Sequence, residues 1–256
     1  MKKKILEIKN LTKHFGGLTA VSGLDFDVRE GEILGMIGPN GAGKSTTFNL
    51  IAGTYPATEG EVQFSGEPVL GLPPHRIAAK GIMRTFQHNR PFGGMPVIEN
   101  VMVGAHTRFT STLWSVVAGF SRKEEIEKRR RAEELVDFVG LGDLRDADVT
   151  TLSFGQGRLL EIARALAGEP RLILFDEPAA GLTQGELDRL GRIMRGIAAR
   201  GIAMLLIEHD MHFLLPLAHR VVVLNFGAKI ADGLPSEIRA DPAVMDAYLG
   251  GSHAAA

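Results

Sequence analysis

The fold of this chain is decided by the stretch Gly38-Pro39-Asn40-Gly41-Ala42-Gly43-Lys44-Ser45. It fills every fixed position of the pattern Gly-x-x-x-x-Gly-Lys-Ser/Thr, and an apolar run at 33–37 comes directly before it. The apolar residues Phe48, Leu50 and Ile51 after it indicate a helix that buries one face. The stretch therefore predicts a glycine-rich loop between a buried strand and a helix, which is the usual setting of a phosphate-binding loop.

The residue types of this loop suit phosphate. Its glycines let successive backbone N–H groups turn toward one anion, and the helix adds the positive end of its dipole. Lys44 would reach the β- and γ-phosphates, Ser45 would offer a hydroxyl to Mg²⁺, and Thr46 would add a hydroxyl beside the phosphates. A glycine-rich turn that only opens a buried helix is the alternative. The strand before the loop and the helix after it favour the phosphate site.

A second buried strand, at 172–175, ends in Asp176, Glu177 and Pro178. The carboxyl ends of strands are where a parallel sheet presents groups to its ligand. Because side chains alternate along a strand, the two carboxylates cannot do the same work. We assign Asp176 to Mg²⁺ and Glu177 to the general base, a role that contributes about 10²–10⁴-fold to a rate. A strand end of this kind could instead cap the next helix, but its pairing with a phosphate-binding loop favours catalysis.

Short apolar runs alternate with amphipathic stretches along most of the chain, as in α/β proteins. Continuous apolar runs at 33–37, 172–175 and 202–207 predict strands at the centre of a parallel sheet. Three stretches near the N-terminus predict a small antiparallel layer, at 5–8, 24–28 and 61–64. A hairpin at 221–224 and 229–231 would close one edge. The predicted fold class is α/β with a P-loop NTPase core.

The middle of the chain has a different character. From 96 to 148 no comparable buried strand is visible, and residues 122–139 place apolar side chains among dense charge, which predicts a helix. The arginine triplet at 129–131 could bind an acidic partner, but neighbouring glutamates favour a solvated helix face. We expect one domain over 1–256, with a core at 1–93 and 151–256 and a helical subdomain at 94–150.

Composition narrows the function classes. The chain has 256 residues, of which 45% are hydrophobic and 23% charged, and its formal net charge is -1. That balance gives no overall attraction to nucleic acid or to an anionic membrane. The absence of cysteine excludes disulfides, thiolate catalysis and cysteine-ligated zinc. No apolar run approaches the roughly 18 residues of a membrane span, and charge interrupts the basic N-terminus, so we expect neither a span nor a signal peptide.

The segment between the loop and the strand-end carboxylates is Leu152-Ser153-Phe154-Gly155-Gln156-Gly157-Arg158, and it opens another predicted helix. It resembles the signature sequence of ATP-binding cassette (ABC) ATPases. The resemblance extends from Leu6 to Leu249. It implies that family's fold, a RecA-like core with an antiparallel β layer and an inserted α-helical subdomain, with ATP and Mg²⁺ as cofactors. It also implies a head-to-tail dimer, in which one subunit's ATP contacts the other subunit's signature residues, Ser153, Phe154, Gly155 and Gln156.

Other landmarks of the family follow in order. By resemblance, Phe15 stacks on adenine, Gln87 senses Mg²⁺ and the attacking water, and His209 contacts the γ-phosphate as a switch. The implied catalytic residues are Glu177, His209, Gln87 and Lys44, and the implied metal-site residues are Ser45, Gln87 and Asp176. Alone, Phe15 could equally pack the end of a strand, and His209 could be a hydrogen-bonded loop residue. Their order and spacing favour the family roles.

Two positions depart from the family pattern. Phe154 stands where glycine is most common in the signature, and Thr183 stands where cassettes often have aspartate. We expect Phe154 to alter packing without removing the site. The missing carboxylate at Thr183 bears on how strongly the two ATP sites of the dimer communicate.

Several stretches are similar to one subgroup, the ATP-binding subunits of bacterial branched-chain amino-acid importers. They lie at 12–18, 71–78, 84–87, 176–182 and 207–211. The similarity implies a peripheral ATPase on the cytoplasmic face of the inner membrane, forming a homodimer or a heterodimer with a paralogous ATPase. Its implied partners are two transmembrane permeases and, indirectly, an external solute-binding protein, with no nucleic acid. Urea or amide import, lipopolysaccharide extraction and a soluble non-transport ATPase are the alternatives.

We hypothesise that ATP closes the dimer and that the segment 92–101 moves with it. We predict that Met95, Pro96, Val97 and Ile98 line a groove for a permease helix. The equal alternative is that they pack the helical segment onto the core.

Overall fold

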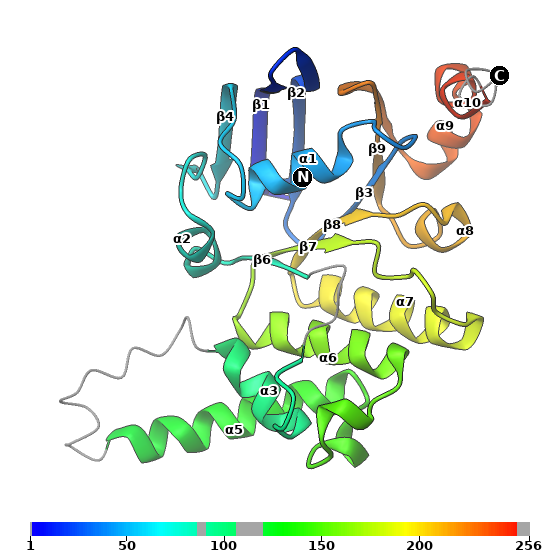
Figure 1. The fold of residues 1–256 in the computed structure, drawn as a ribbon. Helices are drawn as coiled ribbons and strands as arrows, with labels where there is room; N and C mark the ends of the chain where they lie inside the picture. The colour runs from blue at the N-terminus through cyan, green and yellow to red at the C-terminus, as the bar shows by residue number, and fades with distance from the viewer. Residues whose placement is uncertain (1, 86–90, 106–119, 250–256) are drawn as a thin grey trace.

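The computed structural model describes residues 2–85, 91–105 and 120–249 (Figure 1). Its first sheet is antiparallel and has the strand order β2-β1-β4-β5. The strands are β1 (Lys4–Phe15), β2 (Leu18–Arg29), β4 (Glu59–Phe64) and β5 (Glu67–Pro68). The predicted antiparallel layer is therefore confirmed, although β1 and β2 extend well beyond 5–8 and 24–28.

The second sheet has the order β10-β9-β3-β8-β7-β6, and all neighbours are parallel except β10 and β9. Its strands are β3 (Ile33–Ile37), β6 (Ile82–Arg84), β7 (Leu172–Asp176), β8 (Ala203–Ile207), β9 (Arg220–Asn225) and β10 (Ala228–Gly233). As predicted, β3, β8 and β7 are central and the β9–β10 hairpin closes one edge. Every residue of these three central strands is buried.

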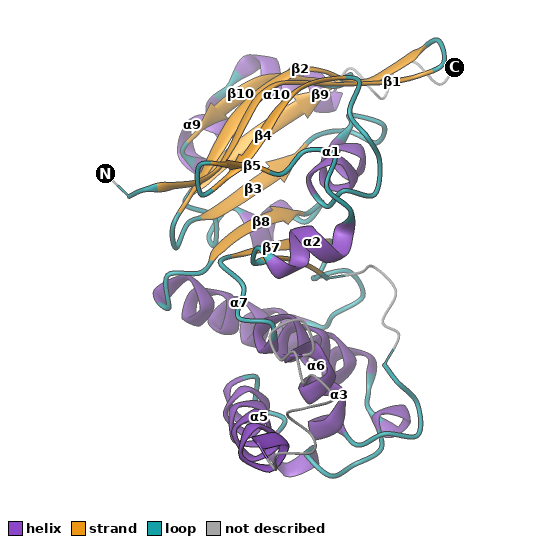
Figure 2. Cartoon of the chain, turned by 90° about the vertical axis from the view of Figure 1, so that its left-hand side faces the viewer, coloured by secondary structure: helices purple, strands orange, loops and turns teal. Residues whose placement is uncertain are grey.

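The helices cover this parallel sheet on both sides (Figure 1, Figure 2). They are α1 (Lys44–Ile51), α2 (Pro74–Ala79), α3 (Val97–Gly104), α5 (Phe120–Phe138), α6 (Phe154–Ala167), α7 (Gln184–Ala199), α8 (Met211–Leu214), α9 (Pro235–Ala240) and α10 (Pro242–Leu249). Short 3₁₀ turns occur at Gly142–Leu144 and Val149–Thr151. Within the described ranges, none of the helices has the length and apolarity that crossing a membrane requires.

Two hydrophobic cores lie on opposite faces of the parallel sheet, and β3 contributes to both. Ile33 and Ile37 belong to the core that includes α6 and α7, whereas Leu34 and Met36 belong to the core shared with α1 and the antiparallel sheet. This alternation explains why the run at 33–37 is continuously apolar. It also fixes the end of β3 between two layers, so the loop that follows starts from a rigid position.

The helical part confirms the predicted helix at 122–139, which is α5. Both α3 and α5 pack against α6, so the helical layer extends past residue 150 (Figure 1). Val97 and Ile98 are buried in the core, while Met95 and Pro96 are partly exposed. The packing alternative therefore describes Val97 and Ile98, and only the other two side chains have surface to offer a partner.

The arginine triplet on α5 lies on a solvated face, as predicted. Arg129 pairs with Glu133 at 3.3 Å, while Arg130 and Arg131 pair with Glu127 at 2.6 Å and 3.1 Å. The arginine side chains are 47% to 57% exposed. These charges are thus paired with glutamates, mostly within the helix, and such exposed pairs contribute little to stability.

Candidate nucleotide-binding site

The phosphate-binding loop joins the carboxyl end of β3 to α1, as predicted. Gly38, Gly41 and Gly43 have positive φ angles of 152°, 79° and 97°. A Cβ atom at Gly43 would lie 2.5 Å from the carbonyl oxygen of Ala20, so only glycine fits there. Gly43 is also the N-cap of α1, and no side chain caps this helix. The first-turn N–H groups of α1 are therefore not taken by a side-chain cap, which suits an anion.

Lys44 begins α1 and is buried beneath the loop. Its Nζ atom donates hydrogen bonds to the carbonyl oxygens of Gly38, at 2.7 Å, and Pro39, at 2.8 Å. Burial lowers the pKa of this amine, while the carboxylates of Glu177 and Asp176 act in the opposite direction. The loop therefore holds a cation within electrostatic range of both strand-end carboxylates.

A cavity of about 440 Å³ opens beside the loop. Its walls come from the β1–β2 hairpin, the loop with the start of α1, the residues after β7 and β8, and the β9–β10 turn. They are Phe15, Leu18, Thr19, Ala20, Asn40, Gly41, Ala42, Gly43, Lys44, Ser45, Thr46, Glu177, His209 and Phe226. The structure thus brings the predicted adenine-stacking residue, most of the loop and three predicted catalytic residues, Lys44, Glu177 and His209, to one cavity. Gln87 lies outside the described residues.

Two aromatic side chains stand on the wall of this cavity. Phe15 is 43% exposed and lies edge-on to Tyr55, with ring centroids 5.6 Å apart. A half-exposed ring in this position suits stacking on a planar base. Phe226 is 88% exposed, with a φ of 45° that large side chains rarely adopt. Sequence reasoning missed Phe226, whose only signal was an aromatic residue inside a tight turn.

The predicted base and the predicted switch touch each other. Glu177 Oε1 lies 2.6 Å from His209 Nε2, and the two residues follow the neighbouring parallel strands β7 and β8. Glu177 has a φ of 51°, and its N–H donates to the carbonyl oxygen of Ile207 at 3.0 Å. Such a conformation costs about 1–3 kcal/mol and persists where the surroundings hold it, often at functional sites. The geometry therefore fixes Glu177 and His209 as one unit at the cavity wall.

Asp176 is the buried member of the carboxylate pair. It is 7% exposed, and its Oδ2 accepts a hydrogen bond from Arg84 Nη2 at 3.0 Å. With the exposed hydroxyl of Ser45 it forms a set of hard oxygen donors, which are the ligands that Mg²⁺ prefers. In the part of the chain that the structure describes, no cluster of three or more histidine or acidic side chains could bind a metal alone. The residues therefore fit a Mg²⁺ ion whose other ligands are phosphate oxygens.

Sequence reasoning also missed Glu208, which precedes His209. Glu208 is 4% exposed, and its Oε1 accepts a hydrogen bond from the N–H of Ala179 at 2.7 Å. Burial raises the pKa of this carboxyl to about 7, although the N–H groups of Ala179 and His209 oppose the shift. This buried side chain ties the segment after Glu177 to the segment that carries His209. A glutamate directly after an apolar strand gives no sequence sign that it points inward.

The signature segment forms the start of α6, and the cavity walls include none of its four residues. Ser153 is the N-cap of the helix. The N–H of Gln156 donates to Ser153 Oγ at 3.3 Å, and the N–H of Ser153 donates to Gln156 Oε1 at 2.8 Å. This reciprocal capping box satisfies two backbone donors within the helix itself. Phe154 is 54% exposed beside it. The segment is therefore a separate surface, away from the cavity of its own chain.

The two departures from the family pattern meet in one place. A Cβ atom at Gly181 would lie 3.1 Å from the ring of Phe154. Thr183 is the N-cap of α7, and both its N–H and its hydroxyl donate to Glu186 at 2.8 Å. A Cβ atom at Gly155 would lie 2.1 Å from that same carboxylate. The segment after the catalytic strand thus packs directly against the signature.

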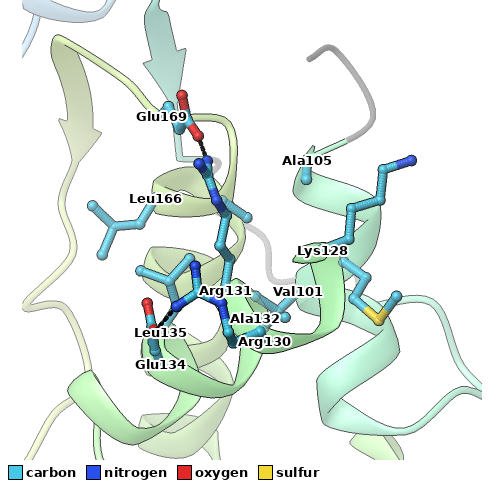
Figure 3. A pocket seen from close by; sticks show the side chains of 12 residues that line it. Val101, Ala105, Lys128, Arg130, Arg131, Ala132, Glu134, Leu135, Leu166 and Glu169 are labelled. Atoms are coloured by element: carbon cyan, nitrogen blue, oxygen red, sulfur yellow. Dashed lines mark hydrogen bonds and ion pairs between the residues drawn. The ribbon is translucent and has the colours of Figure 1, made fainter. Parts of the chain in front are cut away.

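A second cavity, of about 320 Å³, lies between α3, α5 and α6 (Figure 3). Figure 3 shows Arg131 reaching from α5 to Glu169, just past α6, and Arg130 paired with Glu134 on α5. Apolar residues line the rest of the wall, including Val101, Leu135 and Leu166. This cavity belongs to the helical layer and contains none of the predicted site residues.

A glycine-rich loop with a buried lysine, beside two carboxylates at the end of a central parallel strand, defines the class of P-loop nucleotide-binding proteins. The comparisons give the family. The protein-family model described as "ABC transporter" matches residues 21–180, so the chain belongs to the ABC transporter family. A second model, "Branched-chain amino acid ATP-binding cassette transporter", matches residues 228–254. The resemblance predicted from the signature is confirmed.

Curated relatives match over nearly their whole length. The chain is 42% identical, over 255 residues, to the high-affinity branched-chain amino acid transport ATP-binding protein BraF of Pseudomonas aeruginosa, covering 98% of this chain and 99% of BraF. It is 37% identical, over 253 residues, to the similarly described LivG of Escherichia coli K12, with the same coverage. The predicted subgroup is therefore confirmed as a similarity.

Solved structures agree with the fold. The ADP conformation of MJ1267, an ATP-binding cassette of an ABC transporter, superposes with a TM-score of 0.85 at 34% identity, covering 97% of this chain and 99% of that one. The dimeric bacterial cassette MJ0796 has a TM-score of 0.76 at 24% identity, covers 90% of this chain and 99% of that one, and shows the shared fold. The predicted ABC ATPase fold is confirmed.

Proposed function

We propose that this chain is the ATP-binding and ATP-hydrolysing subunit of an importer for branched-chain amino acids. The observation that carries the proposal is the Glu177–His209 contact of 2.6 Å on the wall of the cavity that also holds Lys44. A carboxylate fixed in this way suits a general base for water. The names of BraF and LivG support the solute class, because the match covers almost all of each relative.

In this proposal the chain's own residues divide the work on ATP. The loop at 38–46 binds the phosphates through its N–H groups and Lys44, and Phe15 stacks on the adenine. Glu177 accepts the proton of the attacking water, and His209 reports the γ-phosphate through its contact with Glu177. Ser45 and Asp176 would hold Mg²⁺, which when bound neutralises charge on the β- and γ-phosphates. Gln87 keeps its predicted role at the metal and the water.

The proposed working unit is a head-to-tail pair, either of two copies or of this chain with a paralogue. The signature residues lie away from the cavity of their own chain, so a second subunit must supply them to it. ATP bound between the two subunits would favour the closed pair by mass action. The subunit would lie on the cytoplasmic face of the inner membrane, under two permeases that receive solute from an external binding protein. The helical subdomain at 94–150, with Met95 and Pro96 at its surface, would transmit the closure.

The first test is light scattering on Glu177→Gln with and without Mg-ATP, beside phosphate release by the wild type. We expect the Glu177→Gln variant to form a dimer only with ATP. Its hydrolysis should be about 10²–10⁴-fold slower than that of the wild type. Glu67→Gln is the matched control, because Glu67 is an exposed carboxylate that pairs with Lys80 on the surface. A Glu177→Gln variant that hydrolyses ATP like the wild type would overturn the assignment of the base.

The solute class needs its own test. Co-expression with the neighbouring permease genes should give a complex whose membrane vesicles accumulate leucine in an ATP-dependent way. The same vesicles with the Glu177→Gln subunit should accumulate none. Active ATP hydrolysis with uptake of urea or another amide, and no uptake of leucine, would overturn the solute and leave the motor role intact.

A further inference from the structure

Arg84, the last residue of β6, joins three elements of the nucleotide site. Its Nη2 donates to Asp176 Oδ2, at the end of β7, at 3.0 Å. Its Nη1 donates to the side-chain oxygen of Asn49, on α1, at 2.6 Å. The arginine side chain is 17% exposed and that of Asp176 is 8% exposed. Arg84 thus links the helix that follows the phosphate-binding loop to the predicted metal carboxylate.

The geometry of this link is specific to a guanidinium. A planar fork can donate in two fixed directions at once, whereas an ammonium group acts as a point charge. Removing two charges from water is costly, so a nearly buried ion pair of this kind needs good geometry to persist. The bond to Asn49 fixes one end of the fork and the bond to Asp176 fixes the other. The carboxylate therefore has one oxygen committed to Arg84 and one remaining oxygen with a set direction.

The electrostatic setting matches that arrangement. Asp176 also interacts electrostatically with Lys44, so two cations act on this carboxylate. An oxygen ligand that is held by a neighbouring hydrogen bond binds metal better than one that must first be ordered, and losing such a partner typically costs about 10–100-fold in metal affinity.

We propose that Arg84 is a positioning residue that orients Asp176 for the Mg²⁺ ion of the bound nucleotide. This inference rests on the proposed function, because it assumes that the cavity binds a metal–nucleotide complex. Arg84 acts through Asp176 and needs no contact with ATP. It gives the site a metal-specific element that is distinct from the phosphate-binding loop.

The test separates metal binding from nucleotide binding. Mn²⁺ affinity is measured in the ADP complex from the electron paramagnetic resonance of free Mn²⁺, and ADP affinity is measured in EDTA with a fluorescent analogue. Arg84→Met should weaken Mn²⁺ binding about 10-fold or more. Its metal-free ADP affinity should stay within about 2-fold of the wild type, since the loop and Lys44 are untouched.

Two variants separate positioning from mere stability. Asn49→Ala breaks the bond of Arg84 to α1 but keeps its bond to Asp176, so Mn²⁺ affinity should stay within about 3-fold. Arg171→Met removes an arginine that lies just before β7 and pairs on the surface with Glu30, at 3.5 Å, and should leave both affinities unchanged. If Arg84→Met does not fold, Arg84→Lys replaces it, with an intermediate loss of Mn²⁺ affinity expected because a lysine cannot make both bonds.

The failures are distinguishable. Unchanged Mn²⁺ affinity in a folded Arg84 variant, or an equal loss in Asn49→Ala, would overturn the role of Arg84 alone. Parallel losses of metal-free ADP and Mn²⁺ affinity would assign Arg84 to the stability of the site and overturn positioning. Wild-type protein that binds ADP without Mn²⁺ would overturn the metal assignment on which the inference depends.

Discussion

The N-termini of α1 and α6 are both candidate phosphate sites, but their capping differs. At α1 the N-cap is Gly43 in a left-handed conformation with no side-chain cap, and the buried Lys44 supplies charge. At α6 the N-cap is Ser153, and its reciprocal bonds with Gln156 satisfy two of the backbone donors at this end. The first end has no side-chain cap and is open to a ligand within one chain, while the second is partly occupied by its own side chains.

This difference predicts which helix N-terminus determines nucleotide affinity and which determines turnover in the proposed mechanism. A site with free backbone donors and a buried cation can bind phosphates in a single chain. An end that is already capped gains less from a phosphate and has to exchange a hydrogen bond to receive one. We therefore expect nucleotide affinity to depend mainly on α1, and turnover to depend on α6 of the second subunit.

The largest expected effect comes from adding a Cβ atom inside the phosphate-binding loop that precedes α1. Gly38→Ala would place a Cβ atom 2.1 Å from the carbonyl oxygen of Leu224, which is backbone that cannot give way. We expect a loss of about 3 kcal/mol or more in stability and no measurable ADP binding. Gly41→Ala is the matched control: Gly41 has a φ of 79° but no atom within 4 Å of the added Cβ, so only the backbone strain of about 1 kcal/mol applies. Urea unfolding and fluorescent ADP binding measure both, and equal losses would show that close approach does not explain Gly38.

Removing the Lys44 cation tests directly whether nucleotide affinity depends on α1 and turnover on α6. Lys44→Met should weaken ADP binding to the monomer about 10²–10³-fold, because charge-assisted bonds to two phosphates contribute about 3–4 kcal/mol. Ser153→Ala should leave that affinity within about 2-fold and lose about 1 kcal/mol of stability with the cap. Titration of ADP and steady-state phosphate release give the two readouts. A large loss of ADP affinity in Ser153→Ala would break the comparison.

Mixing the Lys44→Met and Ser153→Ala variants tests whether each site is shared between two subunits. A pair of one Lys44→Met subunit and one Ser153→Ala subunit has one site with both defects and one site with none. We expect the mixture to release phosphate faster than either variant alone. Additive rates at equimolar mixing would contradict sites shared between subunits.

The parts of this comparison that could be predicted from sequence are those in which one short segment carries the structure. Continuous apolar runs announced β3, β7 and β8 because these strands are buried on both faces. The loop and the signature were visible because glycine and capping residues have local requirements. Local chemistry was thus enough for the loop, the capped helix and the sheet centre.

The remainder depends on contacts between distant segments. β1 continues past Asn10, beyond the predicted strand at 5–8, because a φ of 48° and a hydrogen bond from its N–H to Asp25 Oδ1 at 2.9 Å absorb an irregularity in the pairing. Arg84 meets Asp176 from 92 positions away. Glu208 is buried only because the segment at Ala179 covers it. No local pattern encodes such partners.

A pH-dependent effect on stability follows from Glu208, whose carboxyl bonds the segment after β7 to the segment that carries His209. The pKa of its carboxyl is about 7 in the folded chain and 4.5 ordinarily, so the folded state binds the extra proton between these values. Stability from this group is complete below pH 4.5 and is lost as pH rises through 7, by about 3 kcal/mol in total. Glu208→Gln should therefore gain stability over the wild type from about pH 5 to pH 8 in urea unfolding.

The control for Glu208 has the opposite sign. Bonds from the N–H and hydroxyl of Thr183 hold the pKa of Glu186 below its ordinary value, so its contribution is present at neutral pH and lost in acid. Glu186→Gln should thus differ from the wild type mainly above pH 4.5. If both variants changed with pH in the same direction, burial would not be the cause at Glu208.

The smallest expected effect concerns Thr183 at the N-cap of α7, close to the signature segment. Thr183→Asp would restore the carboxylate common in the family, but Thr183 now donates its N–H and hydroxyl to Glu186. A second carboxylate there repels the first, and we expect a small loss of stability. In the Glu186→Gln background the same change should cost close to nothing, since the repelling charge is gone. A double-mutant cycle by urea unfolding measures this coupling, and a loss that persists in that background would place its cause in the cap of α7 alone. Because Glu186 also lies against Gly155, a measurable coupling would show that residue 183 acts on a carboxylate that contacts the start of α6.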